Sequence, residues 1–359
     1  MKITQICPRY YPHIGGVETL VKEISERLAK RGCEIEVLTT DPSGSLPKEE
    51  EINGVRVRHF KSWAPSEAYY FSRTLKRYLA ENSESYDVVH AHSYHAFPAL
   101  YAAQTKGKNK LIFTPHYHGM GHTFFRSLLH IPYEYVAKKI FEKADRVICV
   151  SNFEKDLVLK KFRVDDRKIG VVPNGINLKE FEGLIKKRRV DHKTILYVGR
   201  LEKYKGVDYL IKALPKIDKD IRLEIVGKGP HKQVLLKLVN RLLGVTDRVR
   251  FYQDLSRDEL LQKYVDADIF VLLSKYEAFG ICVAEALASE TPCIVANTSA
   301  LREWVDGKNC FGIEYPINVD ELTHMISKVM RKRVTPSTLR LPTWDESVEK
   351  LTKLYEGIL

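Results

Sequence analysis

The sequence predicts an α/β protein of two doubly wound domains, each a parallel sheet covered by helices. Three observations support this fold class. Short β-branched runs alternate with segments of helical periodicity, which is the pattern of parallel sheets. The chain has 359 residues, more than a single domain usually contains. The alternation also stops at a polar, basic stretch around 183–193 and then starts again.

The first domain, residues 1–182, is expected to alternate strands with amphipathic helices. The opening segment MKITQICPRYYPHIGG has too short an apolar stretch for a signal peptide and is expected to form the first strand. Leu20, Ile24 and Leu28 then recur on one helix face. The candidate strands are ITQIC (3–7), EIEVLTT (34–40), VRVRHF (55–60), DVVHAH (87–92), KLIFTPH (110–116), RVICVS (146–151) and IGVVPN (169–174).

The second domain, residues 190–342, repeats the pattern. The segment 343–359 is expected to form a capped final helix, because Val348, Leu351 and Leu354 have helical spacing. The candidate strands of this domain are TILYVGR (194–200), IRLEIVGK (221–228), VRFYQ (249–253), IFVLLS (269–274), PCIVAN (292–297) and CFGIEY (310–315).

The net charge of +12 is spread evenly along the chain. Residues 1–185 carry 28 Lys and Arg against 22 Asp and Glu, which is half of the excess. The densest cluster, KKRR at 186–189, falls in the expected linker, and no nucleic-acid-binding signature is present. Nucleic acid is therefore not an expected partner, whereas attraction to anionic substrates or anionic lipid stays open.

Two features concern the compartment. No uninterrupted apolar run reaches the ~18 residues that a membrane-spanning helix needs. The cysteines form no C-x-x-C pair, and most lie in apolar runs as small hydrophobic residues do. A reducing cytoplasm is therefore expected. The cysteines are Cys7, Cys33, Cys149, Cys282, Cys293 and Cys310.

Ligands of open parallel sheets bind beyond the carboxyl ends of the strands, so the residues directly after each strand are candidates for a site. Gly15 and Gly16 follow the first strand and precede a helix that runs to about residue 30. Glycine at a helix start lets backbone N–H groups approach a phosphate or sugar closely. A purely structural turn would have the same sequence.

Arg200 and Lys205 flank the loop after the first strand of the second domain. A diphosphate leaving group needs such cations, because Arg binds phosphate oxygens bidentately and Lys supplies a compact charge. Solvated loop charges would look the same in the sequence.

The stretch EAFGICVAEALA places two carboxylates around a glycine. Gly280 opens a helix, so the N–H groups of Phe279, Gly280 and Ile281 are expected to face the ligand. A carboxylate is a poor partner for phosphate but accepts hydrogen bonds from hydroxyls, so Glu277 and Glu285 are expected to bind a sugar and a ribose. The alternative makes Glu277 a helix-start charge and Glu285 a surface residue, which fits the apolar run ICVAEALA poorly.

The fourth candidate site lies in the segment FTPHYHGMGHTFF, where His116 follows a strand. The H-x-H at 90–92 puts two rings on one strand face, so a metal site is an alternative. No H-E-x-x-H motif or carboxylate arrangement completes a catalytic metal site, and a polar substrate pocket is favoured. The histidines between 90 and 130 are His90, His92, His95, His116, His118, His122 and His130.

Several motifs, in their order and spacing, resemble those of the retaining glycosyltransferases of family four. The resemblance covers nearly the whole chain and implies the GT-B fold, in which two Rossmann-like domains face each other across a cleft. The motifs are GGVE (15–18), TPH (114–116), ADRVICVSNFEKD (144–156), VVPNGIN (171–177), GRLEKYKG (199–206), IVGKGP (225–230) and EAFGICVAEALA (277–288).

The resemblance implies a nucleotide-sugar donor on the C-terminal domain, an acceptor on the N-terminal domain, and a final helix 343–359 that crosses back to the first domain. Glu277 would contact the transferred sugar, and His116 would lie over that sugar near the reacting carbon. Glu285 would bind the ribose hydroxyls. The other donor-binding residues that the resemblance implies are Gly15, Gly16, Arg200, Lys205, Gly227, Phe279, Gly280 and Ile281.

The chain departs from the family pattern in two loops. Tyr252-Gln253 stands where relatives often have a glycine after VRF, and Ser299-Ala300 stands where many have Gly-Gly. These changes affect the loops expected to bind the base and the sugar. They leave the expected diphosphate ligands, Arg200 and Lys205, unchanged.

The expected reaction moves a sugar, with retained configuration, to a hydroxyl of a saccharide or lipid-linked acceptor, without a metal or other cofactor. Arg200, Lys205 and a helix N-terminus would stabilise the charge that builds on the leaving diphosphate. A departing phosphate oxygen would take the acceptor proton. The alternatives are a nucleotide-sugar epimerase or hydrolase, for which the sequence shows no water-activating residue, and a non-catalytic sugar-nucleotide-binding module.

The segment HTFFRSLLHIPYEYVAKKIFEK, 122–143, bears on the acceptor. It interleaves Phe124 and Phe125 with Arg126 and Lys138, a composition suited to an anionic bilayer surface. Such contact would make the protein peripheral at the inner membrane face and its acceptor lipid-linked. The alternative is an ordinary amphipathic helix packed on the sheet.

Overall fold

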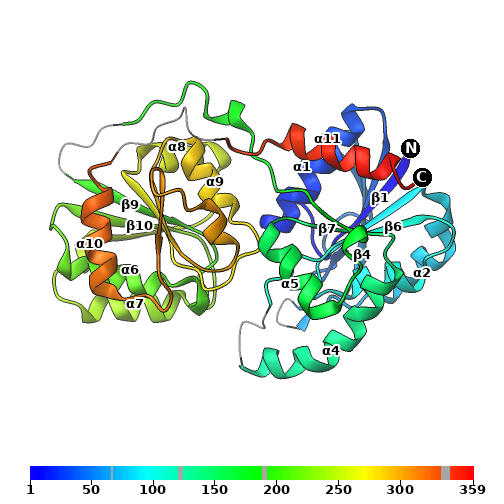
Figure 1. The fold of residues 1–359 in the computed structure, drawn as a ribbon, viewed down its shortest axis with the longest axis horizontal. Coiled ribbons are helices and arrows are strands. Elements are labelled where there is room, and N and C mark those ends of the chain that lie inside the picture. Colours follow the sequence, from blue (N-terminus) through cyan, green and yellow to red (C-terminus); the bar gives the residue numbers. More distant parts are fainter. Residues whose placement is uncertain (66–67, 120–123, 188–191, 333–339) are drawn as a thin grey trace. The chain divides into compact units, whose positions relative to one another are not determined.

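The computed structural model describes residues 1–65, 68–119, 124–187, 192–332 and 340–359, with the backbone alone for 124–132. The chain divides into two units, one of Met1–Gly175 with Pro342–Leu359 and one of Ile176–Leu341. Each unit has its own largely parallel sheet with helices packed on it (Figure 1). The predicted fold class is therefore confirmed.

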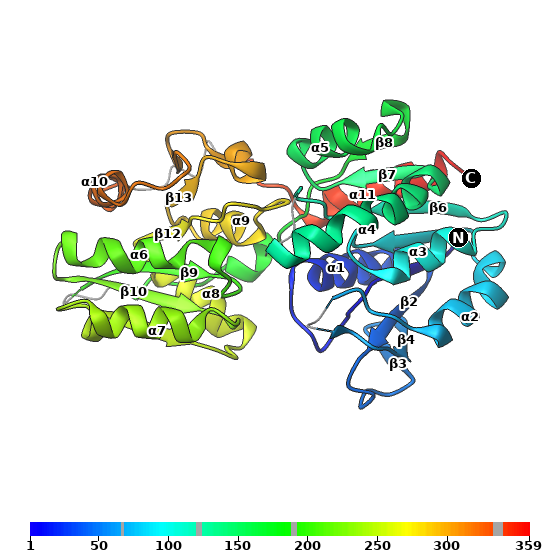
Figure 2. The same cartoon turned by 90° about the horizontal axis from the view of Figure 1, so that it is seen from below.

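The sheet of the first unit has the strand order β3-β4-β2-β1-β5-β6-β7-β8, in which β3 alone pairs antiparallel among the described strands. Figure 2 shows β2, β3 and β4 toward one edge of this sheet and β7 and β8 toward the other. The strands are β1 (Lys2–Ile6), β2 (Glu34–Asp41), β3 (Glu49–Ile52), β4 (Val55–Lys61), β5 (Val88–His92), β6 (Lys110–Thr114), β7 (Arg146–Cys149) and β8 (Ile169–Val171). The helices are α1 (Gly16–Lys30), α2 (Arg73–Asn82), α3 (Phe97–Gln104), α4 (Phe124–Lys143), α5 (Asn152–Phe162) and α11 (Trp344–Glu356).

The edge strand β3 is the one strand of the described chain that the sequence analysis did not predict. Its sequence EEEI offers one apolar residue, so it lacks the β-branched run of the other strands. It pairs with β4 through Ile52 and Val55, around a turn in which Asn53 and Gly54 both have positive φ. Asn-Gly is the usual pair for such a hairpin turn, so these two residues were the sequence signal that could have predicted β3.

Two apolar cores cover the two faces of this sheet. One core combines strand residues such as Ile3 and Val88 with the predicted α1 face, where Leu20, Ile24 and Leu28 are buried. Helix α11 lies beside α1 and adds Val348, Leu351 and Tyr355 to the same core (Figure 1). The other core lies under α2, α3, α4 and α5. The final helix therefore belongs to the first unit.

The second unit has the strand order β11-β10-β9-β12-β13-β14, with every described pair parallel. Helix α6 contacts both α7 and α10, and α8 packs with α9; Figure 1 shows α6 and α7 below the sheet and α8 and α9 above it. The strands are β9 (Lys193–Val198), β10 (Ile221–Val226), β11 (Val249–Tyr252), β12 (Ile269–Leu272), β13 (Cys293–Ala296) and β14 (Cys310–Ile313). The helices are α6 (Val207–Ala213), α7 (Lys232–Arg241), α8 (Arg257–Asp266), α9 (Ile281–Ala288) and α10 (Val319–Val329).

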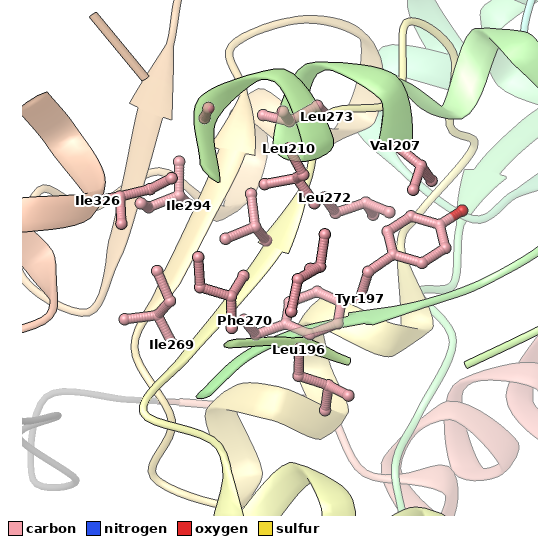
Figure 3. Packing of buried hydrophobic residues seen from close by; sticks show 14 of the residues in the cluster. Leu196, Tyr197, Val207, Leu210, Ile269, Phe270, Leu272, Leu273, Ile294 and Ile326 are labelled. Carbon is pink, nitrogen blue, oxygen red and sulfur yellow. The ribbon is translucent and has the colours of Figure 1, made fainter. Parts of the chain in front are cut away.

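The core of the second unit is built from strand residues and the helix faces that cover them. Figure 3 shows Leu272 of β12 close to Leu210 of α6, Ile294 of β13 beside Ile326 of α10, and Phe270 of β12 farther from Leu210. All five are almost fully buried. Burying one such side chain contributes roughly 1.5–3 kcal/mol, so this core holds the strand ends, and the loops after them, in place.

Candidate functional site

The loops after β9 and β12 meet at the point where the strand order of the second unit reverses. Strands β9 and β12 are neighbours, and the chain continues outward from them in opposite directions. Such a reversal at the carboxyl edge of a parallel sheet is where ligands bind in open α/β folds. The loop after β9 carries Arg200 and Lys205, and the loop after β12 carries Glu277.

Lys205 and Glu277 form an ion pair between these two loops. The Lys205 Nζ lies 2.5 Å from the Glu277 Oε1, and their side chains are 12% and 16% exposed. Burial by itself would lower the pKa of Lys205, but the charge and hydrogen bond of the Glu277 carboxylate, together with Tyr204 and Tyr197, outweigh burial and raise that pKa. Lys205 is therefore a charged ammonium group held at a fixed place by a carboxylate that was also predicted to be functional.

Ser299 supports the Glu277 loop from the neighbouring strand end. The Glu277 N–H donates to the Ser299 Oγ at 3.0 Å, and the Glu277 carbonyl accepts from the Ala300 N–H at 3.3 Å. Ser299 has a φ of 50°, in the left-handed region that glycine adopts most easily. The departure from Gly-Gly at 299–300 thus keeps a glycine-like backbone and adds a side-chain hydrogen bond. Sequence reasoning had placed this loop in doubt and missed that role.

The predicted helix start after Glu277 is found at Ile281, the first residue of α9. Gly280 precedes it with a φ of 93°, which favours glycine. Within the described part of the chain, the N–H groups of Phe279, Gly280 and Ile281 donate to no protein acceptor. The Phe279 carbonyl is fixed by the Trp304 Nε1–H at 2.8 Å. The start of α9 therefore presents unpaired N–H groups next to the ion pair.

Glu285 is buried, at 8% exposure, so the alternative of a surface residue is wrong. Its Oε1 lies 2.5 Å from an Arg257 Nη1, and its Oε2 accepts from the Tyr264 hydroxyl at 2.9 Å. Arg257 and Tyr264 lie seven positions apart on α8, which puts them on the helix face that packs against α9. Sequence reasoning missed both. The ribose role of Glu285 stays a prediction.

Arg200 is the more exposed of the two predicted diphosphate ligands. Its side chain is 56% exposed, and one Nη2 lies 3.2 Å from the Glu202 Oε1. The backbone beneath it is held, because the Arg200 carbonyl accepts from the buried Tyr197 hydroxyl at 2.8 Å. The next residue, Leu201, donates its N–H to the Lys228 carbonyl at 2.8 Å.

Gly227 has a packing reason to be glycine. Its φ is 146°, and a Cβ at this position would clash with the Gly199 carbonyl oxygen. The loops after β9 and β10 can approach this closely because neither residue has a side chain. Gln253, the second departure from the family pattern, donates to the Gly227 carbonyl at 3.4 Å. The proposed contact of Gly227 with a donor stays a prediction.

In the first unit, α1 begins at Gly16 as predicted, and Gly15 precedes it in extended backbone. A Cβ on Gly15 would clash with the carboxylate of Glu18. Glu18 lies 3.0 Å from the Arg9 Nε and is almost fully buried. Gly15 therefore makes room for a carboxylate of this chain at the helix start, and its predicted role at a donor is untested.

His116 lies in a strained loop after β6. Its φ is 51°, and within the described chain its buried Nε2 has no partner. Burial lowers the pKa of His116 to about 3, so the ring is neutral. The next N–H, that of Tyr117, donates to the Glu154 Oε1 at 2.5 Å, and Glu154 is fully buried. Glu154 therefore supports the loop that carries His116. Ser151-x-x-Glu154 is a capping-box pattern, so the sequence could have drawn attention to Glu154.

A buried row of polar side chains connects His116 to the final helix. The His92 ring stacks on the His116 ring with centroids 5.8 Å apart, and the His92 Nε2 lies 2.7 Å from the Gln5 Oε1. An amide oxygen only accepts, so the His92 Nε2 carries the proton. Gln5 in turn donates to the Tyr355 hydroxyl of α11 at 3.2 Å, and that hydroxyl lies 2.7 Å from the His90 Nδ1.

The histidine cluster bears on the metal alternative. Among the residues that the structure describes, no group of three His, Cys, Asp or Glu side chains is arranged to hold a metal ion. His122 and the side chain of His130 lie outside the described residues. His90 and His92 share one face of β5, as predicted, with ring centroids 4.2 Å apart.

The helix predicted to touch a membrane is found as α4. Its later part packs into the first unit, where Tyr133, Ala137 and Phe141 are buried. Residues 122 and 123, and the side chains of Phe124, Phe125 and Arg126, lie outside the described residues. Of the helices described, none combines the length and apolar character that crossing a bilayer requires.

Comparisons with known proteins match both halves of the chain to family models. Residues 14–180 match the family model described as Glycosyltransferase Family 4, and residues 180–341 match the one described as Glycosyl transferases group 1. An uncharacterized glycosyltransferase of Methanocaldococcus jannaschii is 32% identical, over 92% of this chain and 89% of its own.

Two further relatives carry more specific descriptions. A D-inositol 3-phosphate glycosyltransferase of Xylanimonas cellulosilytica is 28% identical, over 80% of this chain and 76% of its own. The solved structure of Anabaena HepE in complex with UDP and glucose has a TM-score of 0.78 at 18% identity, covering 99% of both chains. At that identity, the likeness supports the fold.

Proposed function

Because the chain belongs to the group 1 glycosyltransferases of family 4, we propose that it transfers a hexose from a nucleotide-diphosphate donor to a hydroxyl acceptor. We further propose that the transfer retains the anomeric configuration and needs no metal. The observation that carries the proposal is the Lys205–Glu277 ion pair beside the unpaired N–H groups at the start of α9.

This arrangement offers the two kinds of group that a nucleotide-sugar donor needs. Lys205, Arg200 and the α9 N-terminus supply positive charge toward a leaving diphosphate, the part that a metal ion plays in other phosphate chemistry. Glu277 supplies hydrogen-bond acceptors for sugar hydroxyls. A departing phosphate oxygen then takes the proton of the acceptor hydroxyl as the new glycosidic bond forms.

The two units are proposed to share the substrates. The donor is assigned to the second unit through Arg200, Lys205, Gly227 and Glu285. The neutral His116 in the first unit can accept or donate one hydrogen bond through its unpartnered nitrogen, which suits a sugar hydroxyl. The acceptor, a saccharide or a lipid-linked molecule, is assigned to the first unit.

We also propose that the reaction takes place in a reducing cytoplasm and that the protein contacts an anionic membrane peripherally. All six cysteines are described, and each is a free thiol. All six lie in apolar cores or pack against one, as structural cysteines do.

Donor screening tests the proposal. UDP-glucose is the first candidate, because the HepE structure holds UDP and glucose; GDP- and ADP-sugars complete the set. A bound donor at 100 times its Kd adds about 2.7 kcal/mol to the free energy of unfolding, which a thermal shift detects. NMR of the product should then show the donor's anomeric configuration.

The alternatives give other results in the same assay. Donor consumption that needs no acceptor and releases free sugar indicates a hydrolase, and a changed sugar still attached to the nucleotide indicates an epimerase. Donor binding without any turnover indicates a binding module. Inverted configuration in the product would refute the retaining mechanism.

A further inference from the structure

A cavity of about 700 Å³ in the first unit has none of the residues assigned to the donor in its lining. Its lining comes from the end of β4 and the loop after it, the start of α2, and α3. This volume lies within the usual range for small-molecule sites. No function has so far been given to this part of the unit.

One wall of the cavity is aromatic. The Phe71 and Phe97 ring centroids are 4.2 Å apart, and the Trp63 ring lies 5.5 Å from that of Phe71. Leu100 and Tyr101 continue the wall on α3 and are themselves buried. These neighbouring rings give the lining a continuous aromatic part.

Trp63 lies on this wall and is 67% exposed. Its backbone is fixed, because its N–H and carbonyl both bond to Phe71 at 2.9 Å. A large apolar side chain that is held in place and left in water beside a cavity is a typical feature of a binding surface. Tryptophan in particular suits a boundary between apolar groups and water.

The same lining also carries positive charge. Lys61, Arg73 and Lys76 line it, their side chains are exposed, and no Asp or Glu is in the lining. None of the three forms an ion pair with a carboxylate in the described part of the chain. The Lys76 Nζ lies 6.0 Å from the centroid of the Tyr101 ring, so charged and aromatic groups of the lining are direct neighbours.

This combination selects one class of ligand. A free saccharide is disfavoured, because sugar hydroxyls need acceptors and the lining has no carboxylate. The Ser72 Oγ already donates to the Lys61 carbonyl at 2.8 Å and accepts from the Leu75 N–H at 3.3 Å. This leaves weaker neutral acceptors in the lining, such as the Ser62 hydroxyl and the Gln104 amide. An apolar chain would fill the aromatic side, at about 0.8 kcal/mol per buried methylene. A phosphate on that chain would then meet the three cations.

We propose that this cavity binds the apolar chain and phosphate of a lipid-linked acceptor. This proposal identifies the acceptor of the proposed function as a lipid-linked molecule. The role of the cavity as an acceptor site therefore rests on that function. Binding of the lipid phosphate to the cavity does not depend on the proposed function, because every lining residue lies in the first unit, whereas Arg200, Lys205 and Glu277 lie in the second.

Decyl phosphate, below its micelle concentration, is the probe. Isothermal titration with the full chain should show binding at least tenfold tighter than that of inorganic phosphate or of the neutral decyl glucoside. The fluorescence of Trp63 should shift to the blue, since this ring is exposed while Trp344 is buried and Trp304 is half-buried. The Trp63→Ala variant should lose that shift and weaken binding.

A matched pair of triple variants tests the charge. Lys61→Gln, Arg73→Gln and Lys76→Gln together should weaken decyl phosphate binding at least tenfold. The control variant Lys30→Gln, Arg56→Gln and Lys108→Gln removes the same charges from exposed positions of the same unit and should bind within twofold of the unmodified chain. Both variants replace exposed side chains, so each is expected to fold.

Three outcomes would overturn the proposal. These are no binding of decyl phosphate, an equal loss in both triple variants, and binding only to phosphatidylglycerol vesicles, which would make the surface a membrane contact. Donor thermal shift, measured on the same variants, separates this test from that of the function. If decyl phosphate binds as expected while no sugar is transferred, the site stands and the proposed function fails.

Discussion

The Lys205 Nζ lies 2.5 Å from the Glu277 Oε1, although 72 residues separate the two along the chain. The contact exists because β9 and β12 are neighbours, so the loops that follow them meet at one edge of the sheet. The sequence predicted a function for each residue separately. The structure shows that the two side chains hold each other in position and that the Glu277 carboxylate raises the pKa of Lys205.

Replacing Lys205 by Ala should reduce donor turnover about 10²- to 10³-fold, because it removes a cation proposed to stabilise the leaving diphosphate. It should also lower the free energy of unfolding by about 1–3 kcal/mol, because the largely buried Glu277 carboxylate loses its partner. Lys203→Ala, at an exposed position of the same loop, is the control for kinetics and urea denaturation. The double variant Lys205→Ala/Glu277→Gln should regain stability but not turnover; near wild-type turnover in Lys205→Ala would refute the diphosphate site.

Replacing Arg200 by Ala should separate binding from stability. Turnover should fall about 10²-fold, because the variant loses a cation proposed to stabilise the leaving diphosphate. The Tm should stay within a degree or two of the unmodified chain, because the Arg200 side chain is 56% exposed. Arg241→Ala, another exposed arginine of the second unit, serves as the control. A large drop in Tm with turnover preserved would make Arg200 a structural residue instead.

Gly227→Ala should destabilise the second unit by several times the cost of an ordinary glycine substitution, because the added Cβ would clash with the Gly199 carbonyl. Gly244→Ala is the matched control. Gly244 also has positive φ but has open space around its Cβ position, so only backbone strain of about 1 kcal/mol is expected there. Chemical denaturation of both variants measures the difference, and equal costs would show that the two loops can separate freely.

The buried histidines should make the protein sensitive to acid. Burial lowers the pKa of His90 to about 3, whereas a histidine of the unfolded chain titrates near 6.5. The stability from keeping this ring neutral is therefore fully present above pH 6.5 and is lost as pH falls toward 3, by about 1.4 kcal/mol per pH unit. Glu154 acts in the opposite direction, because burial raises its pKa to about 8 and its contribution is lost as pH rises from 4.5.

Comparing variants isolates the histidine part of this pH dependence. The loss of unfolding free energy between pH 7 and pH 5 should be smaller in His90→Gln than in the unmodified chain, even though the variant is less stable at pH 7. The exposed His13→Gln should leave the loss unchanged. An identical loss in His90→Gln would mean that His90 titrates normally in the folded protein.

Turnover should be unaffected by EDTA, because the charge on the leaving diphosphate is proposed to be met by Arg200, Lys205 and the start of α9. The measurement is the initial rate after dialysis against chelator, with Mg²⁺, Mn²⁺ and Zn²⁺ added back one at a time. Complete inhibition that a single metal reverses would overturn the metal-free mechanism and direct attention to the histidine cluster.

Local patterns in the sequence determined the elements of this protein. Short runs rich in apolar and β-branched residues marked every described strand except β3, and the spacing of Leu20, Ile24 and Leu28 identified the buried face of α1. The Thr343–Glu346 capping box begins α11 close to the residue where the final helix was expected. Such features depend on neighbours a few residues apart, so periodicity and capping chemistry are enough to find them.

Only the tertiary structure decided which of the predicted residues meet. Strand order brings Lys205 to Glu277, and the packing of α8 on α9 brings Arg257 to Glu285. The docking of α11 beside α1 places Tyr355 among the histidines of the first unit. These contacts join residues tens or hundreds of positions apart, and they are fixed by how sheets and helices bury apolar area against each other. No local pattern records that choice, because the same strands and helices are compatible with other strand orders.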